Sequence, residues 1–141
     1  MEYLLPKNRA QQIYVVAQME NDYLLHALKN LNLSYDTAAI IKYVNDHPGT
    51  RQKEIAEYIN KQPASVTNMI KRLEKRLLLI RRVDPDNSRE KQVFLLKDGL
   101  DMVTKIKQAE QDLDDLIDPY VQADGSVKIR EFYQTLKQKL G

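Results

Sequence analysis

The spacing of apolar residues predicts helices in the first third of the chain. Between about Asn8 and Leu31, apolar side chains recur at intervals of three and four, which is typical of one long amphipathic helix. A second helix is expected after Ser34, a favourable N-cap residue. Pro48-Gly49 should end it, because neither residue continues a helix well.

The C-terminal third repeats this pattern. Gly99 precedes a predicted helix that Pro119 closes, and a last helix is expected to begin near Ser126. The apolar stripe of the last helix is too narrow to form a core by itself. We therefore expect that helix to pack against another element.

The middle of the chain changes from helical to strand-like spacing. Two short helices are predicted over residues 51–60 and 63–77. Two strand-like runs follow at 79–83 and 90–96, and the turn-rich segment 84–88 separates them. This order predicts two close helices followed by a β-hairpin.

The pair of short helices meets the steric demands of a helix-turn-helix. Ala56 is small enough for a second helix to approach, and Asn60 tolerates a left-handed turn. Val66 should lie inside the crossing, in a small core with Ile55, Ile59 and Met69.

The second helix of this motif presents a polar face opposite its apolar one. That face carries short residues at its start and basic ones later: Ala64, Ser65, Asn68, Lys71, Arg72 and Lys75. Asn68 can pair with adenine in the major groove, and Lys71 or Arg72 can contact guanine or phosphate. The alternative is an ordinary solvated helix face, which any surface helix shows.

The predicted hairpin strengthens the DNA-binding interpretation. Its turn places Arg89 near the tip of a protruding wing, where an arginine can enter the narrow minor groove of DNA. Asp84 or Asp86 is expected to support the wing by holding the Arg89 guanidinium.

Charge is distributed unevenly along the chain. The formal net charge is only +2, but residues 51–97 carry 12 Lys or Arg against 6 Asp or Glu. A basic region that coincides with the helix-turn-helix and hairpin favours a nucleic-acid partner over a merely solvated surface.

Composition excludes several other functions. The chain has no cysteine, no run of apolar residues long enough to span a bilayer, and no secretion signal at its N-terminus, so we expect a cytoplasmic protein. Two histidines and no glycine-rich phosphate loop offer little basis for catalysis. We predict no enzyme activity, no cofactor and no metal. A calcium loop is excluded because Arg89 stands where its turn requires glycine.

Taken together, these motifs resemble the MarR family of bacterial and archaeal regulators. The resemblance rests on the run from Ser65 to Arg76, on Arg81-Arg82, on Asp84 to Arg89 and on Val93 to Gly99. It implies a mainly α fold with a small β wing: a winged helix-turn-helix DNA-binding domain at 35–99, with dimerisation helices at 1–34 and 100–141 in a single compact domain.

The resemblance also implies partners and site residues. It implies a homodimer on a pseudo-palindromic operator, usually a repressor, and a small anionic or phenolic effector, for which Tyr14, Tyr23 and Tyr43 either line a cavity or simply pack in the core. The predicted DNA-binding residues are Arg51, Gln52, Ala64, Ser65, Thr67, Asn68, Lys71, Arg72, Lys75, Asn87 and Arg89. The predicted dimer interface comprises Ile13, Val16, Leu24, Ile129, Phe132, Tyr133, Leu136 and Leu140.

Three residues depart from the family pattern. Leu77 replaces a usual glycine after the recognition helix, so we expect a longer or differently shaped exit turn. Asn87 replaces a frequent aspartate, which leaves the charge of Arg89 less neutralised, and Leu96 replaces a threonine that would cap the next helix.

The competing hypothesis for the function of the chain is a winged-helix scaffold that binds proteins and not DNA.

Overall fold

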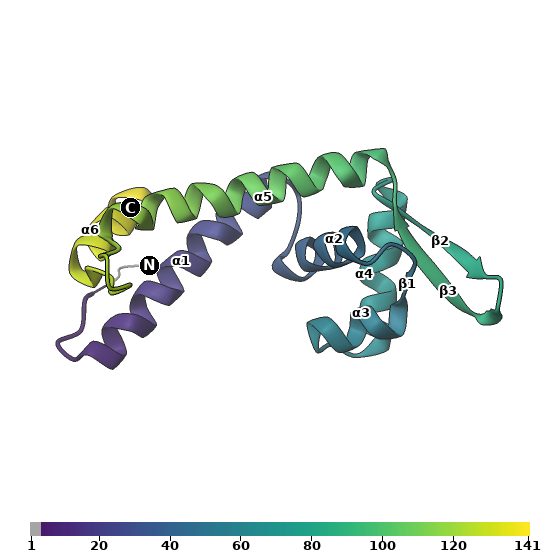
Figure 1. Cartoon of the computed structure of the whole chain (residues 1–141), viewed down its shortest axis with the longest axis horizontal. Helices are drawn as coiled ribbons and strands as arrows, with labels where there is room; N and C mark the ends of the chain where they lie inside the picture. The colour runs from purple at the N-terminus through teal and green to yellow at the C-terminus, as the bar shows by residue number, and fades with distance from the viewer. Residues whose placement is uncertain (1–3) are drawn as a thin grey trace. The chain divides into compact units, whose positions relative to one another are not determined.

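The computed structural model describes residues 4–141, which form two compact units (Figure 1). One unit contains residues 4–31 and 107–141, and the other contains residues 32–106. Helix α5 (Lys97–Ile117) contributes residues to both. Within residues 4–141, no helix is long and apolar enough to cross a membrane.

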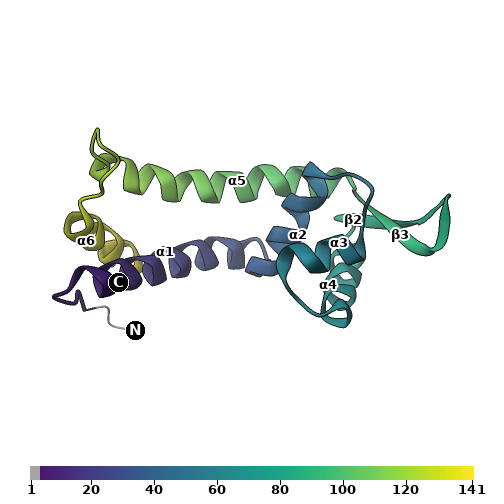
Figure 2. The same ribbon diagram turned by 60° about the horizontal axis from the view of Figure 1, so that its bottom comes forward.

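The unit of residues 4–31 and 107–141 is helical. It contains α1 (Arg9–Asn30), the end of α5, the 3-10 turn η1 (Asp118–Tyr120) and α6 (Ile129–Leu140). Helix α6 lies beside α1 in both ribbon views (Figures 1 and 2). Their contact buries Val16, Met19, Phe132, Tyr133 and Leu136. The apolar stripe of α6 thus packs against α1, as expected for a stripe too narrow to form a core by itself.

Helix α6 begins at Ile129, slightly later than the sequence indicated. The residues before it form a loop that is closed by an isolated antiparallel β-bridge between Val121 and Val127. The Lys128 N–H donates to the Tyr120 carbonyl oxygen at 2.8 Å, and the Tyr120 and Thr135 hydroxyls share a hydrogen bond. This loop therefore fixes the start of α6.

The unit of residues 32–106 is a winged helix-turn-helix. It contains α2 (Tyr35–Asp46), α3 (Gln52–Ile59), α4 (Pro63–Lys75) and the strands β1 (Thr50–Arg51), β2 (Leu79–Asp84) and β3 (Asn87–Leu95). The strands form one antiparallel sheet in the order β1-β3-β2. The predicted fold class, mainly α with a small β wing, is confirmed.

Local sequence signals explain where these helices start and stop. Ser34 caps α2 in a capping box with Thr37. Asn60 adopts the predicted left-handed conformation, with φ 55° and ψ 52°, at the end of α3. The Lys61 N–H then donates to the Ala56 carbonyl oxygen at 3.1 Å, which satisfies a carbonyl at the helix end.

Leu77 also adopts a left-handed conformation, with φ 58°. After α4, the Leu78 N–H donates to Leu73 O at 3.1 Å and the Leu77 N–H donates to Glu74 O at 3.0 Å. This is the turn that glycine usually makes at a helix end. The longer or differently shaped turn expected from the Leu77 substitution is therefore not formed, and a leucine carries the strain instead.

Two features near the sheet differ from the sequence prediction. The two-residue strand β1 was not foreseen, and Arg51 belongs to it and not to α3. Gly99 lies inside the first turn of α5, where a Cβ atom would stand 2.0 Å from Leu78 O. Gly99 therefore allows the start of α5 to pack closely against the backbone of Leu78, just before β2. The sequence had placed Gly99 before the helix, but α5 already begins at Lys97.

Candidate nucleic-acid interface

The two faces of α4 are separated as the sequence predicted. Val66, Ile70 and Leu73 are buried beneath the helix. The opposite face is exposed and carries Ala64, Ser65, Asn68, Lys71, Arg72 and Lys75. This helix thus offers solvent a polar surface with three cations and short side chains at its N-terminal end.

Thr67 and Gln52, both predicted to contact DNA, are engaged inside the protein. The Gln52 side-chain amide donates to Thr67 Oγ1 at 3.1 Å, and the Thr67 hydroxyl donates to Pro63 O at 3.0 Å. Both side chains are only partly exposed. They connect the starts of α3 and α4 and so fix the angle between the two helices.

Arg81 of β2 extends this connection to the wing. Its Nη1 donates to Gln52 Oε1 at 3.3 Å, and its Nη2 forms a 3.0 Å ion pair with Glu74 Oε1 of α4. The hydrogen bond from Arg81 holds the pKa of Glu74 below its usual range, despite partial burial. Helices α3 and α4 and strand β2 are therefore joined through one guanidinium.

The root of the wing is held by a second arginine. Arg51 Nη2 lies 2.6 Å from Asp84 Oδ2, and Arg51 Nε also donates to that oxygen at 3.2 Å. The other carboxylate oxygen of Asp84 accepts the Asp86 N–H at 2.9 Å. Asp84 is buried, and these contacts lower its pKa, with the Arg51 hydrogen bond as the largest cause.

This arrangement corrects the predicted role of Asp84. The carboxylate supports the wing, but it does so by binding Arg51 of β1 and not Arg89. Asp86 contributes its backbone N–H, and its side chain is exposed. Within residues 4–141, no carboxylate forms an ion pair with Arg89.

Arg89 lies in a β-bulge. Strand pairing jumps from Val83↔Lys91 to Asp84↔Asn87, so residues 88–90 have no opposite residues in β2. The Arg89 N–H donates to Asn87 Oδ1 at 3.1 Å, which fixes the backbone while the side chain remains exposed. Asn87 thus positions the chain at Arg89 but does not neutralise its charge.

A hollow of about 320 Å³ lies between this bulge, β1 and the starts of α3 and α4. It is lined by Arg51, Gln52, Lys53, Thr67, Arg81, Arg89, Glu90 and Lys91. Five of these side chains are cationic and Glu90 is the one carboxylate among them. Such a surface attracts anions.

Several residues of this surface were missed from the sequence. Glu74, Arg81 and Glu90 reach their partners only through the fold, because strand pairing and the bulge set their positions. Arg81 was noted only as part of the family resemblance, and no sequence pattern paired it with Gln52.

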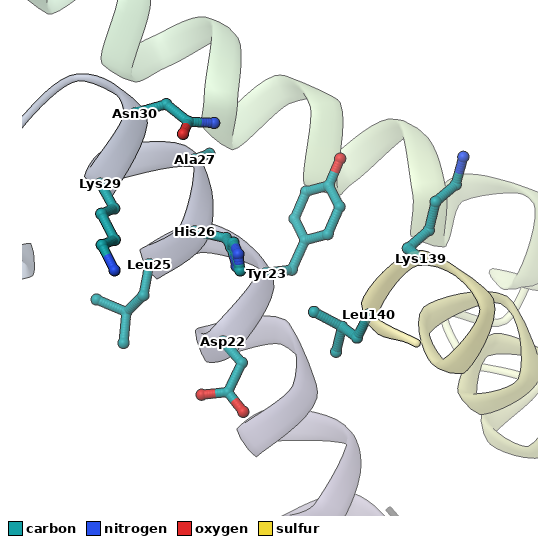
Figure 3. A pocket seen from close by; sticks show the side chains of 9 residues that line it. All are labelled: Asp22, Tyr23, Leu25, His26, Ala27, Lys29, Asn30, Lys139 and Leu140. Atoms are coloured by element: carbon teal, nitrogen blue, oxygen red, sulfur yellow. The ribbon is translucent and has the colours of Figure 1, made fainter. Parts of the chain in front are cut away.

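A second hollow, of about 670 Å³, lies between α1 and the end of α6 (Figure 3). Tyr23, His26 and Lys29 of α1 and Lys139 of α6 line it, and the Leu140 side chain points from α6 toward α1. Of the three tyrosines considered for an effector cavity, only Tyr23 lines this hollow. Tyr14 is exposed on α1.

Tyr43 instead belongs to an aromatic stack. Its ring lies 4.3 Å from that of His47 and 4.5 Å from that of Tyr58, measured between centroids. Within residues 4–141, no group of three or more histidine, aspartate or glutamate side chains is arranged to hold a metal ion.

The residues predicted for a dimer interface fall into two groups. Val16, Phe132, Tyr133 and Leu136 are buried where α1 packs on α6, so they already hold the single chain together. Leu24, Ile129 and Leu140 are half-buried, and Ile13 is 57% exposed. Tyr14, beside Ile13 on α1, is 63% exposed.

Comparison with known proteins agrees with this fold. Residues 33–91 match the model of the MarR family, whose members are DNA-binding transcription regulators and not enzymes. The resemblance predicted from the sequence is thereby confirmed over this segment. No curated protein matches the sequence.

Three solved structures have the same fold. Apo MarR from E. coli is 19% identical, with a TM-score of 0.72 over 99% of this chain and 100% of that one. A variant of S. aureus MepR bound to an oligodeoxyribonucleotide is 17% identical, with a TM-score of 0.71 over 96% and 97%. YusO from Bacillus subtilis is 16% identical, with a TM-score of 0.72 over 94% and 92%.

Proposed function

We propose that this chain, whose residues 33–91 form a MarR family domain, is a sequence-specific transcriptional repressor in the cytoplasm. It binds a pseudo-palindromic operator as a homodimer, and a small anionic or phenolic effector releases it. The observation that carries this proposal is the exposed polar face of α4 next to the basic hollow of the wing.

The two parts of this surface have different roles. Helix α4 enters the major groove, where Asn68 reads a base edge and Lys71 and Arg72 contact guanine or phosphate. Arg89 enters the minor groove from the bulge of the wing. Gln52 and Thr67 act mainly by holding α3 and α4 in place, because their polar groups are already used inside the protein.

Exposed apolar side chains support the homodimer. Ile13 and Tyr14 lie side by side on α1, and both are more than half exposed. Two large apolar side chains exposed on a helix that is expected to dimerise offer apolar area to a second copy of the chain. In sedimentation experiments, Ile13→Lys should weaken the dimer, whereas Glu57→Lys, at an exposed position of α3 in the other unit, should leave it intact.

The hollow of Figure 3 supports an effector site. Lys29 and Lys139 supply positive charge against one carboxylate, Asp22, and Tyr23 supplies an aromatic wall, which together suit a small aromatic anion. Benzoate should therefore perturb the Tyr23 ring signals in NMR spectra and weaken operator binding. Lys139→Gln should reduce both effects.

Selection of bound sequences from random duplexes tests the central proposal. A repressor of this kind enriches two half-sites centred about 34–36 Å apart. Its affinity should fall steeply with salt, because each neutralised phosphate adds about 0.9 to the log-log slope. No enrichment together with a flat salt response would favour the protein-binding scaffold.

A further inference from the structure

The basic hollow of the wing contains one negative side chain, Glu90, and its position suggests regulation of DNA binding. Glu90 Oε2 lies 2.7 Å from Arg51 Nε. The same guanidinium binds Asp84. Arg51 is thus shared by two carboxylates that differ in their surroundings.

The two carboxylates hold Arg51 unequally. Both hydrogen bonds from Arg51 go to Asp84, whose side chain is 3% exposed and whose other oxygen is bonded to the Asp86 N–H. Glu90 contacts Arg51 as an ion pair, and its side chain is 37% exposed. Asp84 therefore anchors the arginine, whereas Glu90 can leave it at small cost, because exposed ion pairs contribute little.

The bulge explains why Glu90 reaches Arg51. Residues 88–90 have no opposite residues in β2, so their side chains do not follow the regular alternation of the strand. Arg89 and Lys91, on either side of Glu90, also line the hollow. The hollow thus has enough positive charge to hold an anion, and the Glu90 carboxylate already occupies it as an anion of the protein itself.

We propose that Glu90 is a built-in competitor that occupies Arg51 until a phosphate of the DNA backbone displaces it. This inference rests on the proposed function. The phosphodiester replaces Glu90 beside the Arg51 guanidinium, while the two hydrogen bonds to Asp84 keep the arginine in place. Lys53 and Lys91 provide further positive charge for the phosphate. Glu90 then turns toward solvent, where mobile cations screen its charge.

Competition by Glu90 has a specific thermodynamic signature. Displacement costs the wild-type protein part of its binding energy, so Glu90→Gln should bind the selected operator about three- to tenfold more tightly at low salt. Wild-type protein exposes a carboxylate on binding, and that charge attracts mobile cations, whereas the variant exposes none. The log-log salt slope of the variant should therefore be steeper than that of the wild type, by less than the roughly 0.9 that one neutralised phosphate contributes.

Glu57→Gln is the matched control. Glu57 is an exposed carboxylate of α3 in the same unit, and its replacement removes the same charge. It should change affinity by less than about twofold and leave the salt slope unaltered, because Glu57 does not line the hollow and an exposed charge is screened. Thermal unfolding should be nearly the same for Glu90→Gln and wild type, since Asp84 still binds Arg51.

The experiment measures operator affinity of the three proteins by fluorescence anisotropy over a range of salt concentrations. Equal effects of Glu90→Gln and Glu57→Gln, or weaker binding by Glu90→Gln, would overturn the competitor role while leaving the proposed function intact. Failure of all three proteins to bind the duplex would overturn both.

A second readout identifies the source of the phosphate. The NMR signal of Arg51 Nε–H should shift when the operator duplex is added to the wild type. Inorganic phosphate at matched ionic strength should leave that signal in place. A similar shift with millimolar inorganic phosphate alone would show a general anion site and contradict the proposal.

Discussion

Arg51 and Asp84 are 33 residues apart in the sequence, yet the guanidinium of one and the buried carboxylate of the other form the shortest ion pair of the wing root, at 2.6 Å. This contact joins the first and second strands across β3. It therefore holds the root of the hairpin against β1, next to the start of α3.

Asp84→Asn should destabilise the protein in a pH-dependent manner. The Arg51 hydrogen bond lowers the pKa of Asp84 in the folded state, so its stabilisation is complete above the unfolded-state pKa, about 3.9, and is lost as pH falls through the lower folded-state pKa. At pH 7 the melting temperature should drop by a few degrees, on the order of 2–8 °C. Urea unfolding should show the difference from wild type shrinking below about pH 4; a constant difference down to pH 2 would contradict this account.

Leu77→Gly should stabilise the protein. Leu77 adopts a left-handed conformation and is 65% exposed, so glycine removes strain at little cost in burial. After the entropy cost of glycine, we expect a gain of about 0.5–1 kcal/mol in the free energy of unfolding. Leu100→Gly, at an exposed site in the helix α5, should instead lose about 1 kcal/mol. Destabilisation by both substitutions would show that Leu77 is not strained.

Gly99→Ala should destabilise the protein although alanine is the better helix former. A Cβ atom at Gly99 would stand 2.0 Å from the backbone oxygen of Leu78, and backbone cannot move aside as a flexible side chain can. Overpacking of this kind costs about 1–3 kcal/mol and outweighs the gain in propensity of about 1 kcal/mol. Chemical denaturation should reveal this loss, with Thr104→Ala on the exposed side of α5 remaining within about 0.5 kcal/mol of wild type.

Asn68→Ala should reduce base discrimination more than overall affinity. Asn68 is exposed on α4, and an asparagine amide can pair with adenine, a contact that contributes about 1–3 kcal/mol of discrimination. Lys71→Ala should weaken binding to all sequences about equally if it contacts phosphate. Competition assays with single-base variants of the operator distinguish these effects, and an unchanged preference in Asn68→Ala would remove Asn68 from the contact assignment.

Arg89→Ala should abolish the preference for a narrow minor groove beside the half-site. The exposed guanidinium at the bulge is available for this contact, since no carboxylate in residues 4–141 pairs with it. Arg82→Ala is the control, because Arg82 belongs to the same hairpin but lies over the Phe94 ring, 5.6 Å from its centroid. Footprinting on A-tract and mixed flanks should separate the two variants. Identical footprints would argue against a minor-groove role for Arg89.

The sequence predicted features that depend on neighbouring residues. Apolar spacing located the helices, the turn-rich segment located the hairpin, and Asn60 was correctly assigned a left-handed turn. The polar face of α4 followed from the same periodicity, since burial of Val66 and Ile70 requires Asn68 to face outward. Local spacing is sufficient for such features because helix geometry fixes which residues share a face.

Features that depend on distant residues were not predictable in the same way. The ion pairs of Asp84 and Glu90 with Arg51 require strand register, and that register includes a bulge that no local pattern indicated. The strand β1 has only two residues, too few for alternation to be visible. The sequence therefore named Asp84 as a wing support but assigned it the wrong arginine.

The shortness of β1 has a mechanical consequence. Thr50 and Arg51 pair with Val93 and Gln92, and the very next residue opens α3. No flexible residue lies between the sheet and α3, so a change in the orientation of the hairpin is transmitted directly to the helix-turn-helix. If DNA binding reorients one of these two parts, we expect the other to move with it.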